Sequence, residues 1–178
     1  GLAEMRIRSS NQEIVDQTAT FNVKGSLSIV PDNPSVGNTL AINAYAMLPS
    51  EEVKIHVRTD EIEATADTMG RVQANYVLPE LPNGEVSIEL SSVNLLKPLI
   101  SQIKVTPRLK FDKASAAVGE VINVRGTGFN PTERVLIKVG EAIPATLSNI
   151  LVDDRGSFGS DGDLSFSVPG AGSSVITI

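Results

Sequence analysis

The sequence predicts an all-β protein made of two β-sandwiches in tandem, preceded by two further strands. Three observations predict this fold: apolar and polar side chains alternate over short runs, Gly, Pro and Asn interrupt the runs about every ten residues, and the same signals occur twice. Alternation with a period of two sends one set of side chains into a core and the other to solvent. No stretch of twelve residues carries a helical stripe, and residues 147–154, LSNILVDD, are a weak candidate for one turn.

The alternation is clearest in three short runs, each rich in β-branched or aromatic residues. Side chains two positions apart lie on one face of a strand, so each run predicts three core residues. These residues are Val53, Ile55 and Val57 in EVKIHVR, Val135, Ile137 and Val139 in RVLIKV, and Leu164, Phe166 and Val168 in DLSFSV.

A comparison of the chain with itself indicates a tandem duplication. When the chain is shifted by 82 residues, residues 36–57 lie on 118–139 without a gap, with 7 identities in 22 positions. The identities fall at turn residues and at inward-facing strand positions, where a shared fold requires them. They are Val36, Gly37, Pro49, Glu51, Val53, Ile55 and Val57, which meet Val118, Gly119, Pro131, Glu133, Val135, Ile137 and Val139.

The phase of the duplication predicts three segments. Residues 1–37 parallel residues 84–119, so we expect residues 1–24 to be the last two strands of a preceding repeat. The first repeat, residues 25–107, has its full set of strands. The second repeat, residues 108–178, lacks a counterpart of the closing strand ISQIKVTP, residues 100–107.

A sandwich without its closing strand exposes unpaired backbone groups and part of its core. One explanation is that the strand lies beyond the sequence considered. The other is that a neighbouring molecule supplies it, because residues 18–25, TATFNVKG, resemble the closing strand and could be added by β-augmentation. The second explanation predicts head-to-tail self-assembly.

The second repeat resembles the immunoglobulin-like repeats of bacterial and archaeal cell-surface proteins, near the IPT/TIG-type families. The resemblance covers about 150 residues by the internal match and implies a Greek-key β-sandwich. In the first repeat Ala44 and Ala46 replace two of the glycines and Met47 replaces the phenylalanine, so its assignment depends on the internal match. The motif, loosely Gly, strand, Gly-x-Gly-Phe, Pro, strand, Gly-Ser-Phe, strand, Pro, is carried by Gly119, Gly126, Gly128, Phe129, Pro131, Gly156, Ser157, Phe158 and Pro169.

Two features that could mark an active site have structural explanations. Gly126 and Gly128 could cradle a phosphate, but a strand and not a helix follows them, so we interpret them as a corner between two sheets. His56 is the only histidine, and it lies on the polar face of its strand with Lys54 and Arg58, as a surface residue does.

Two groups of acidic residues could carry a function. Asp161 and Asp163, with Asp153 and Asp154 nearby, could supply oxygen ligands to calcium, although their spacing differs from a helix-loop-helix site. Asp67 and Asp153 each precede a glycine by three positions, which also fits a turn in which Asp bonds its own backbone. A second acidic group, made of Asp60, Glu61, Glu63 and Asp67, could serve glycoside hydrolysis, but a solvated face is the simpler interpretation.

We therefore expect a non-enzymatic structural segment, such as a spacer, stalk or fibre module, of a larger cell-surface or extracellular protein. The alternative is an adhesion or ligand-binding module that uses the loop of residues 155–163, with calcium as its one candidate cofactor. The expected partners are neighbouring repeats of the same protein. Nucleic acid and small-molecule ligands are not expected.

Overall fold

The computed structural model describes residues 2–7, 17–140, 143–160, 162–168, 170 and 176–177. In these residues the chain forms antiparallel strands and one short 3-10 helix, so the predicted all-β class is confirmed. The elements are β1 (Leu2–Ile7), β2 (Gln17–Asn22), β3 (Ser26–Val30), β4 (Thr39–Tyr45), β5 (Glu52–Val57), β6 (Asp60–Thr65), β7 (Val72–Val77), β8 (Gly84–Ser91), β9 (Leu99–Val105), β10 (Arg108–Phe111), β11 (Val121–Thr127), β12 (Arg134–Val135), β13 (Lys138–Val139), η1 (Ala145–Leu147), β14 (Ile150–Leu151), β15 (Ser165–Ser167) and β16 (Ile176–Thr177).

By its internal contacts the chain divides into two compact units. The first contains residues 1–30, 41–75 and 87–101, and the second contains residues 31–40, 76–86 and 102–178. These units do not coincide with the predicted repeats, because three pieces of residues 25–107 are grouped with residues 108–178. The repeat boundaries at 24/25 and 107/108 therefore stay predictions, and "first repeat" and "second repeat" refer below to residues 25–107 and 108–178.

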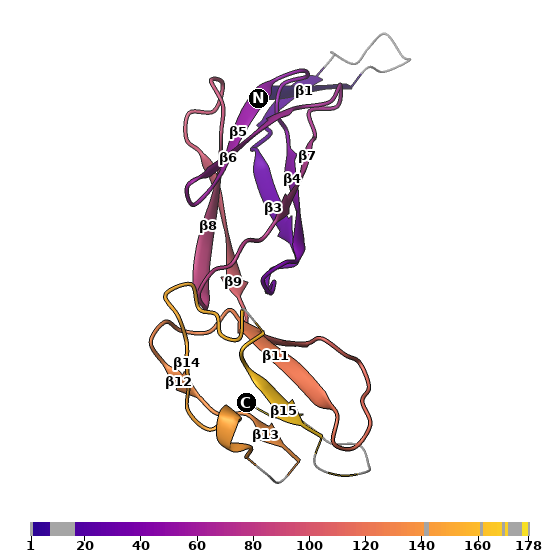
Figure 1. The fold of residues 1–178 in the computed structure, drawn as a ribbon. Helices are drawn as coiled ribbons and strands as arrows, with labels where there is room; N and C mark the ends of the chain where they lie inside the picture. Colours follow the sequence, from indigo (N-terminus) through magenta and orange to yellow (C-terminus); the bar gives the residue numbers. More distant parts are fainter. Residues whose placement is uncertain are drawn as a thin grey trace. The chain divides into compact units, whose positions relative to one another are not determined.

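The first repeat contains a sheet of order β3-β4-β7 and a sheet of order β6-β5-β8-β9. In Figure 1 the strands of each sheet form a separate group, and both groups belong to residues 25–107. The predicted inward residues Val53, Ile55 and Val57 are each at most 1% exposed, and β4 and β8 bury alternate residues in the same way. The period-two pattern thus correctly identified the buried face of β5.

The second repeat contains a sheet of order β10-β11-β15 and two strand pairs, β12-β14 and β13-β16. Predicted core residues Ile137, Val139 and Phe166 are buried in one cluster, and Val135 and Leu164 pack against it partly buried. The run RVLIKV is divided between β12 and β13 because its two ends pair with different strands. In LSNILVDD, residues 150–151 form a strand, and the 3-10 helix ends at residue 147.

The N-terminal strands pair with each other. β1 and β2 are antiparallel, with Leu2 opposite Asn22 and Ile7 opposite Gln17. The predicted counterparts in the first repeat, β8 and β9, are also neighbours in their sheet. That residues 1–24 derive from a preceding repeat stays a prediction, as does strand exchange by residues 18–25.

The strand register is the same in both repeats. Ser26 is opposite Tyr45 in the β3–β4 pair, and Arg108 is opposite Thr127 in the β10–β11 pair, so both partners are displaced by the 82 residues found in the sequence. At the far end of these pairs Ile29 faces Ile42, and Phe111 faces Val124, with the same displacement. The duplication inferred from the sequence therefore extends to the backbone pairing.

The turns repeat in the same way. The Gly37 N–H donates to Leu78 C=O at 2.9 Å, and the Gly119 N–H donates to Val168 C=O at 3.0 Å. Likewise the Met47 N–H donates to Gly70 C=O at 3.1 Å, and the Phe129 N–H to Gly156 C=O at 2.9 Å. These bonds connect elements that are distant in sequence, so the two repeats share a three-dimensional framework as well as a sequence pattern.

Ala46 occupies a backbone conformation that suits glycine better. Its φ is +64°, and the equivalent residue of the second repeat is Gly128 with φ +76°. A left-handed conformation costs a non-glycine residue about 1–2 kcal/mol, although glycine also gains entropy in the unfolded chain. We expect Ala46→Gly to raise the free energy of unfolding by about 0.5–1 kcal/mol, measured by urea denaturation.

The matched control is Ala74→Gly in β7, whose φ is not positive. There the glycine only adds unfolded-state entropy, so the substitution should destabilise by about 1 kcal/mol. An equal loss of stability in both variants would show that the strain at Ala46 does not matter.

Candidate functional site

The glycines of the Gly-x-Gly-Phe corner allow close packing in the second repeat. Gly126 lies in β11, and a Cβ added to it would lie 2.1 Å from Cζ of Phe158, so only glycine leaves room for that ring. The Phe158 ring also packs against Phe129, with 5.1 Å between ring centroids. After the corner the chain enters β12, which belongs to a different strand pair. The prediction of a corner between sheets is confirmed at these residues.

Asp67 and Asp153 are turn residues, as one of the two interpretations predicted. Oδ1 of Asp153 accepts hydrogen bonds from the backbone N–H groups of Arg155 at 2.9 Å and Ser157 at 2.8 Å. Oδ1 of Asp67 accepts the equivalent bonds from Met69 and Arg71. Gly70 and Gly156 follow with φ of +72° and +76°. One carboxylate oxygen of each aspartate is therefore used to hold its own turn.

The calcium site stays a prediction. Asp161 lies outside the described residues, and Asp163 is exposed. Within the described part of the chain no three His, Cys, Asp or Glu side chains gather as metal ligands. Oδ1 of Asp153 holds its own turn.

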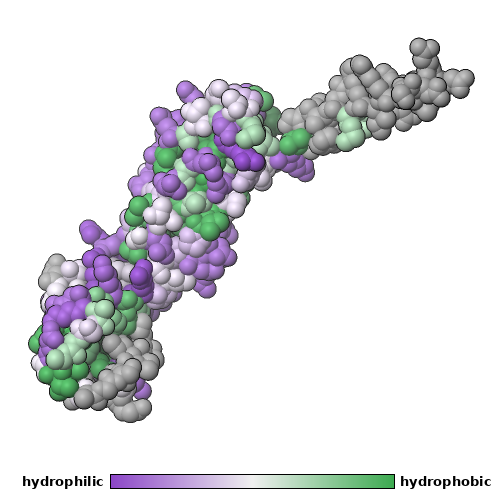
Figure 2. Space-filling view, turned by 90° about the vertical axis from the view of Figure 1, so that its right-hand side faces the viewer, coloured by the Kyte–Doolittle hydropathy of each residue, from purple (hydrophilic) through white to green (hydrophobic). Residues whose placement is uncertain are grey.

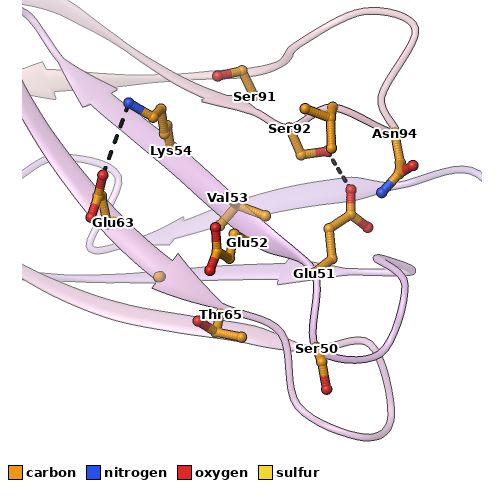
Figure 3. Close-up of a pocket in the computed structure, with 12 residues that line it drawn as sticks. Ser50, Glu51, Glu52, Val53, Lys54, Glu63, Thr65, Ser91, Ser92 and Asn94 are labelled. Atoms are coloured by element: carbon orange, nitrogen blue, oxygen red, sulfur yellow. Dashed lines mark hydrogen bonds and ion pairs between the residues drawn. The ribbon is translucent and has the colours of Figure 1, made fainter.

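A groove of about 700 Å³ lies on the first repeat, and sequence reasoning did not predict it. It is formed where β5 and β6 approach the 92–94 loop after β8 (Figure 3). Most of the residues that line it are polar, and Val53, Ala64 and Val93 are apolar. The polar lining residues are Ser50, Glu51, Glu52, Lys54, Glu63, Thr65, Ser91, Ser92 and Asn94.

Glu51 is the buried carboxylate of this groove and is 7% exposed. It accepts hydrogen bonds from the Leu48 N–H at 2.6 Å and from the Ser92 hydroxyl (Figure 3). Burial on its own raises the pKa of Glu51, but the bonds from Ser92, Leu48 and Asn94 outweigh it and hold the pKa below its ordinary value. A general base for neutral pH needs a pKa near 7, so Glu51 has the character of a structural acceptor.

Lys54 and His56 lie on the solvent face of β5, opposite β6. Lys54 Nζ pairs with Glu61 Oε1 at 2.7 Å and with Glu63 at 3.9 Å. His56 Nε2 lies 3.6 Å from Glu61 Oε2, and its side chain is 41% exposed. The hydrogen bond from Lys54 lowers the pKa of Glu61. The acidic group of Glu61 and Glu63 thus forms a solvated ion-pair network, as the simpler interpretation of these residues held.

Hydrophilic and hydrophobic residues are interspersed on the face shown in Figure 2. The most exposed apolar side chains, Val93 at 96% and Leu96 at 103%, belong to the loop between β8 and β9. Among the described residues, no helix has the length and apolar character required to cross a membrane.

The chain was compared with known proteins. No protein family matches it, and no curated protein resembles it closely enough to be counted as a match. The resemblance to immunoglobulin-like surface repeats therefore stays a prediction from the motif.

Proposed function

We propose that this chain is a non-enzymatic structural segment of a larger cell-surface or extracellular protein, in which sandwich repeats follow one another as a spacer or stalk. The observation that carries the proposal is the duplicated framework: the β3–β4 and β10–β11 pairs share one register, and the turn bonds recur at equivalent residues. Repetition of one fold along a chain is the arrangement of proteins that gain length by adding modules.

The strand order of the first repeat supports an immunoglobulin-like sandwich. Its sheets contain three and four strands, and the chain changes sheet between β4 and β5, between β6 and β7 and between β7 and β8, an arrangement that such a Greek-key fold accommodates. A fold of this kind does not define an activity by itself. The surface location is inferred from the resemblance to bacterial and archaeal surface repeats.

The chemistry of the described side chains also supports a structural segment. Both carboxylate oxygens of Glu51 accept hydrogen bonds, and Asp67 and Asp153 hold turns. The start of the 155–163 loop contacts the protein itself, because the Gly156 backbone lies against Pro82. The alternative of a binding loop at 155–163 is therefore less well supported than the structural segment.

The proposal is tested by stretching the chain from its two ends in optical tweezers. We expect two separate, reversible unfolding events, one for each repeat, with a gain of at most about 3.5 Å per residue released. A chain that lengthens gradually under load, with no discrete event, would contradict a role as a series of load-bearing modules.

A further inference from the structure

The corner of the second repeat contacts a turn of the first repeat. The turn is residues 80–83, between β7 and β8, and the corner comprises Arg125, residues 128–129 and residues 155–156. All of these residues belong to the second compact unit, so their mutual contacts are internal to that unit. We define the turn and the corner together as the joint.

The joint contains a charged contact. Arg125 Nη2 forms an ion pair with Glu80 Oε1, and Nη1 of Arg155 lies 4.0 Å from Glu80 Oε2. The Glu80 side chain is 25% exposed and that of Arg125 is 41% exposed. Partial burial makes the pair less sensitive to solvent screening than a fully exposed one. The carboxylate of the turn is therefore matched to a guanidinium of the corner.

The joint also contains a backbone contact of defined geometry. The Asn83 N–H donates to Phe129 C=O at 3.1 Å. A Cβ added to Gly156 would lie 2.7 Å from Cα of Pro82, and one added to Gly128 would lie 2.7 Å from Thr106 C=O. Glycine at both positions lets the corner approach the turn at backbone distance. It also lets the corner approach residues 106–107, the linker between β9 and β10, in the same way. Such proximity is sensitive to any added side chain.

Thr106 is itself fixed to the first repeat. Its N–H donates to Pro34 C=O at 2.9 Å, and its hydroxyl lies 3.2 Å from that of Ser35. The corner of the second repeat thus meets two parts of the first, the 80–83 turn and the anchored linker. The bonds of Thr106 to Pro34 and Ser35 fix the linker along its length, and not only at its two ends.

We propose that the corner is an interaction surface for a turn of the repeat that precedes it, and that this joint couples consecutive repeats. The partner it fits is a Pro-Asn turn that presents a carboxylate to Arg125 and a backbone N–H to Phe129. In this chain the partner is residues 80–83. The inference rests on the proposed function and adds to it the surface by which one module engages the next.

The first repeat has the same framework but different side chains at the equivalent corner. Asn43 stands where the second repeat has Arg125, and Met69 stands where it has Arg155. Neither of the positions whose guanidinium groups lie near Glu80 is therefore an arginine in the first repeat. The chemistry of the joint is consequently selective: the second repeat's corner is matched to an acidic turn.

The test is hydrogen exchange by NMR on the full chain, with the Asn83 amide as the reporter. We expect this amide to be protected in the unaltered protein, and its exchange rate to rise at least tenfold, by an order-of-magnitude estimate, in Glu80→Gln and in Arg125→Gln. Amides bonded within one repeat, Ala66 to Glu51 C=O and Gly126 to Phe158 C=O, should keep their rates. Lys113→Gln, which breaks an ion pair within the second repeat, is the control and should leave Asn83 unchanged.

A second pair of variants adds a methyl group where the corner approaches the turn at backbone distance. Gly70 and Gly156 have similar positive φ, and an added Cβ crowds a backbone carbonyl oxygen in each case, but only Gly156 also faces Pro82. Gly156→Ala should release the Asn83 amide, whereas Gly70→Ala should not. If either alanine variant fails to fold, the Glu80→Gln and Arg125→Gln variants still test whether the joint protects the Asn83 amide.

Two results would overturn the joint. One is an Asn83 amide that exchanges at the rate of an unstructured peptide in the unaltered chain. The other is a protected amide that neither Glu80→Gln nor Arg125→Gln affects. Either result would leave the structural role intact if stretching still gives two discrete events, while gradual lengthening would refute that role whatever the Asn83 amide shows.

Discussion

Replacing Gly126 by alanine is expected to lower the free energy of unfolding of the second repeat by about 3 kcal/mol. The added Cβ would lie 2.1 Å from Cζ of Phe158 and 2.2 Å from Cε1, so the ring or the strand has to move. Phe158 is 5% exposed and lies in the core cluster, which leaves little space for the ring to move into. Equilibrium unfolding in urea, followed by circular dichroism, measures the loss.

The first repeat indicates how the damage can be repaired. At the positions equivalent to Gly126 and Phe158 it has Ala44 and Val72, both completely buried. Phe158→Val alone should cost about 3 kcal/mol because it leaves a cavity. The double variant Gly126→Ala/Phe158→Val should lose at least about 1 kcal/mol less than the two single losses added together, since the new methyl group fills part of that cavity.

The control for the alanine itself is Gly170→Ala, where an added Cβ meets nothing within 4 Å. Its effect should lie within about 0.5 kcal/mol of zero. If the losses at Gly126 and Phe158 proved additive, the ring over the glycine would not be the reason that the corner needs glycine.

Replacing Glu51 by glutamine is expected to cost the first repeat about 2 kcal/mol at neutral pH. The amide is neutral and has one acceptor oxygen where the carboxylate has two, so one of the two donors, the Leu48 N–H or the Ser92 hydroxyl, loses its acceptor and the other keeps an uncharged one. Glu133→Gln is the matched control, because Glu133 occupies the equivalent turn and, among the described residues, bonds only to the N–H and amide of Asn130. We expect that control to cost less than about 1 kcal/mol.

The difference between wild type and Glu51→Gln should depend on pH in a defined direction. Because the folded-state pKa of Glu51 lies below its ordinary value of 4.5, the ionised carboxylate stabilises the fold above that value. This stabilisation is lost as the pH falls through the folded-state pKa. Urea unfolding at a series of pH values from 7 to about 3 measures it, and a difference that stays constant over the series would refute the assignment.

The sequence was sufficient to predict structural features that depend only on residues close together in the chain. Alternation identified Val53, Ile55 and Val57 as core because a strand's period is local. The Asp153 turn was also recognisable, since its hydrogen bonds reach only two and four residues along the chain. Such features need no knowledge of the fold.

Features that join distant residues could not be read in the same way. Ser92 donates to Glu51 across 41 positions, and nothing near either residue indicates the other. The only signal was the identity of Glu51 with Glu133 in the duplication, which indicates importance but not a partner. The ion pair of Glu80 with Arg125 has no such signal, because the equivalent position in the first repeat is Asn43.

The joint has a consequence for how such a chain could evolve. Its two sides are different surfaces, a turn on one repeat and a corner on the next, so the contact is heterologous. A heterologous contact joins two different surfaces head to tail, and it gives the series a direction from one end to the other. Because the acidic turn is on the first repeat and the arginine corner is on the second, copying either repeat alone would not reproduce the matched pair. An expansion that keeps the joint therefore has to copy the two repeats as one unit.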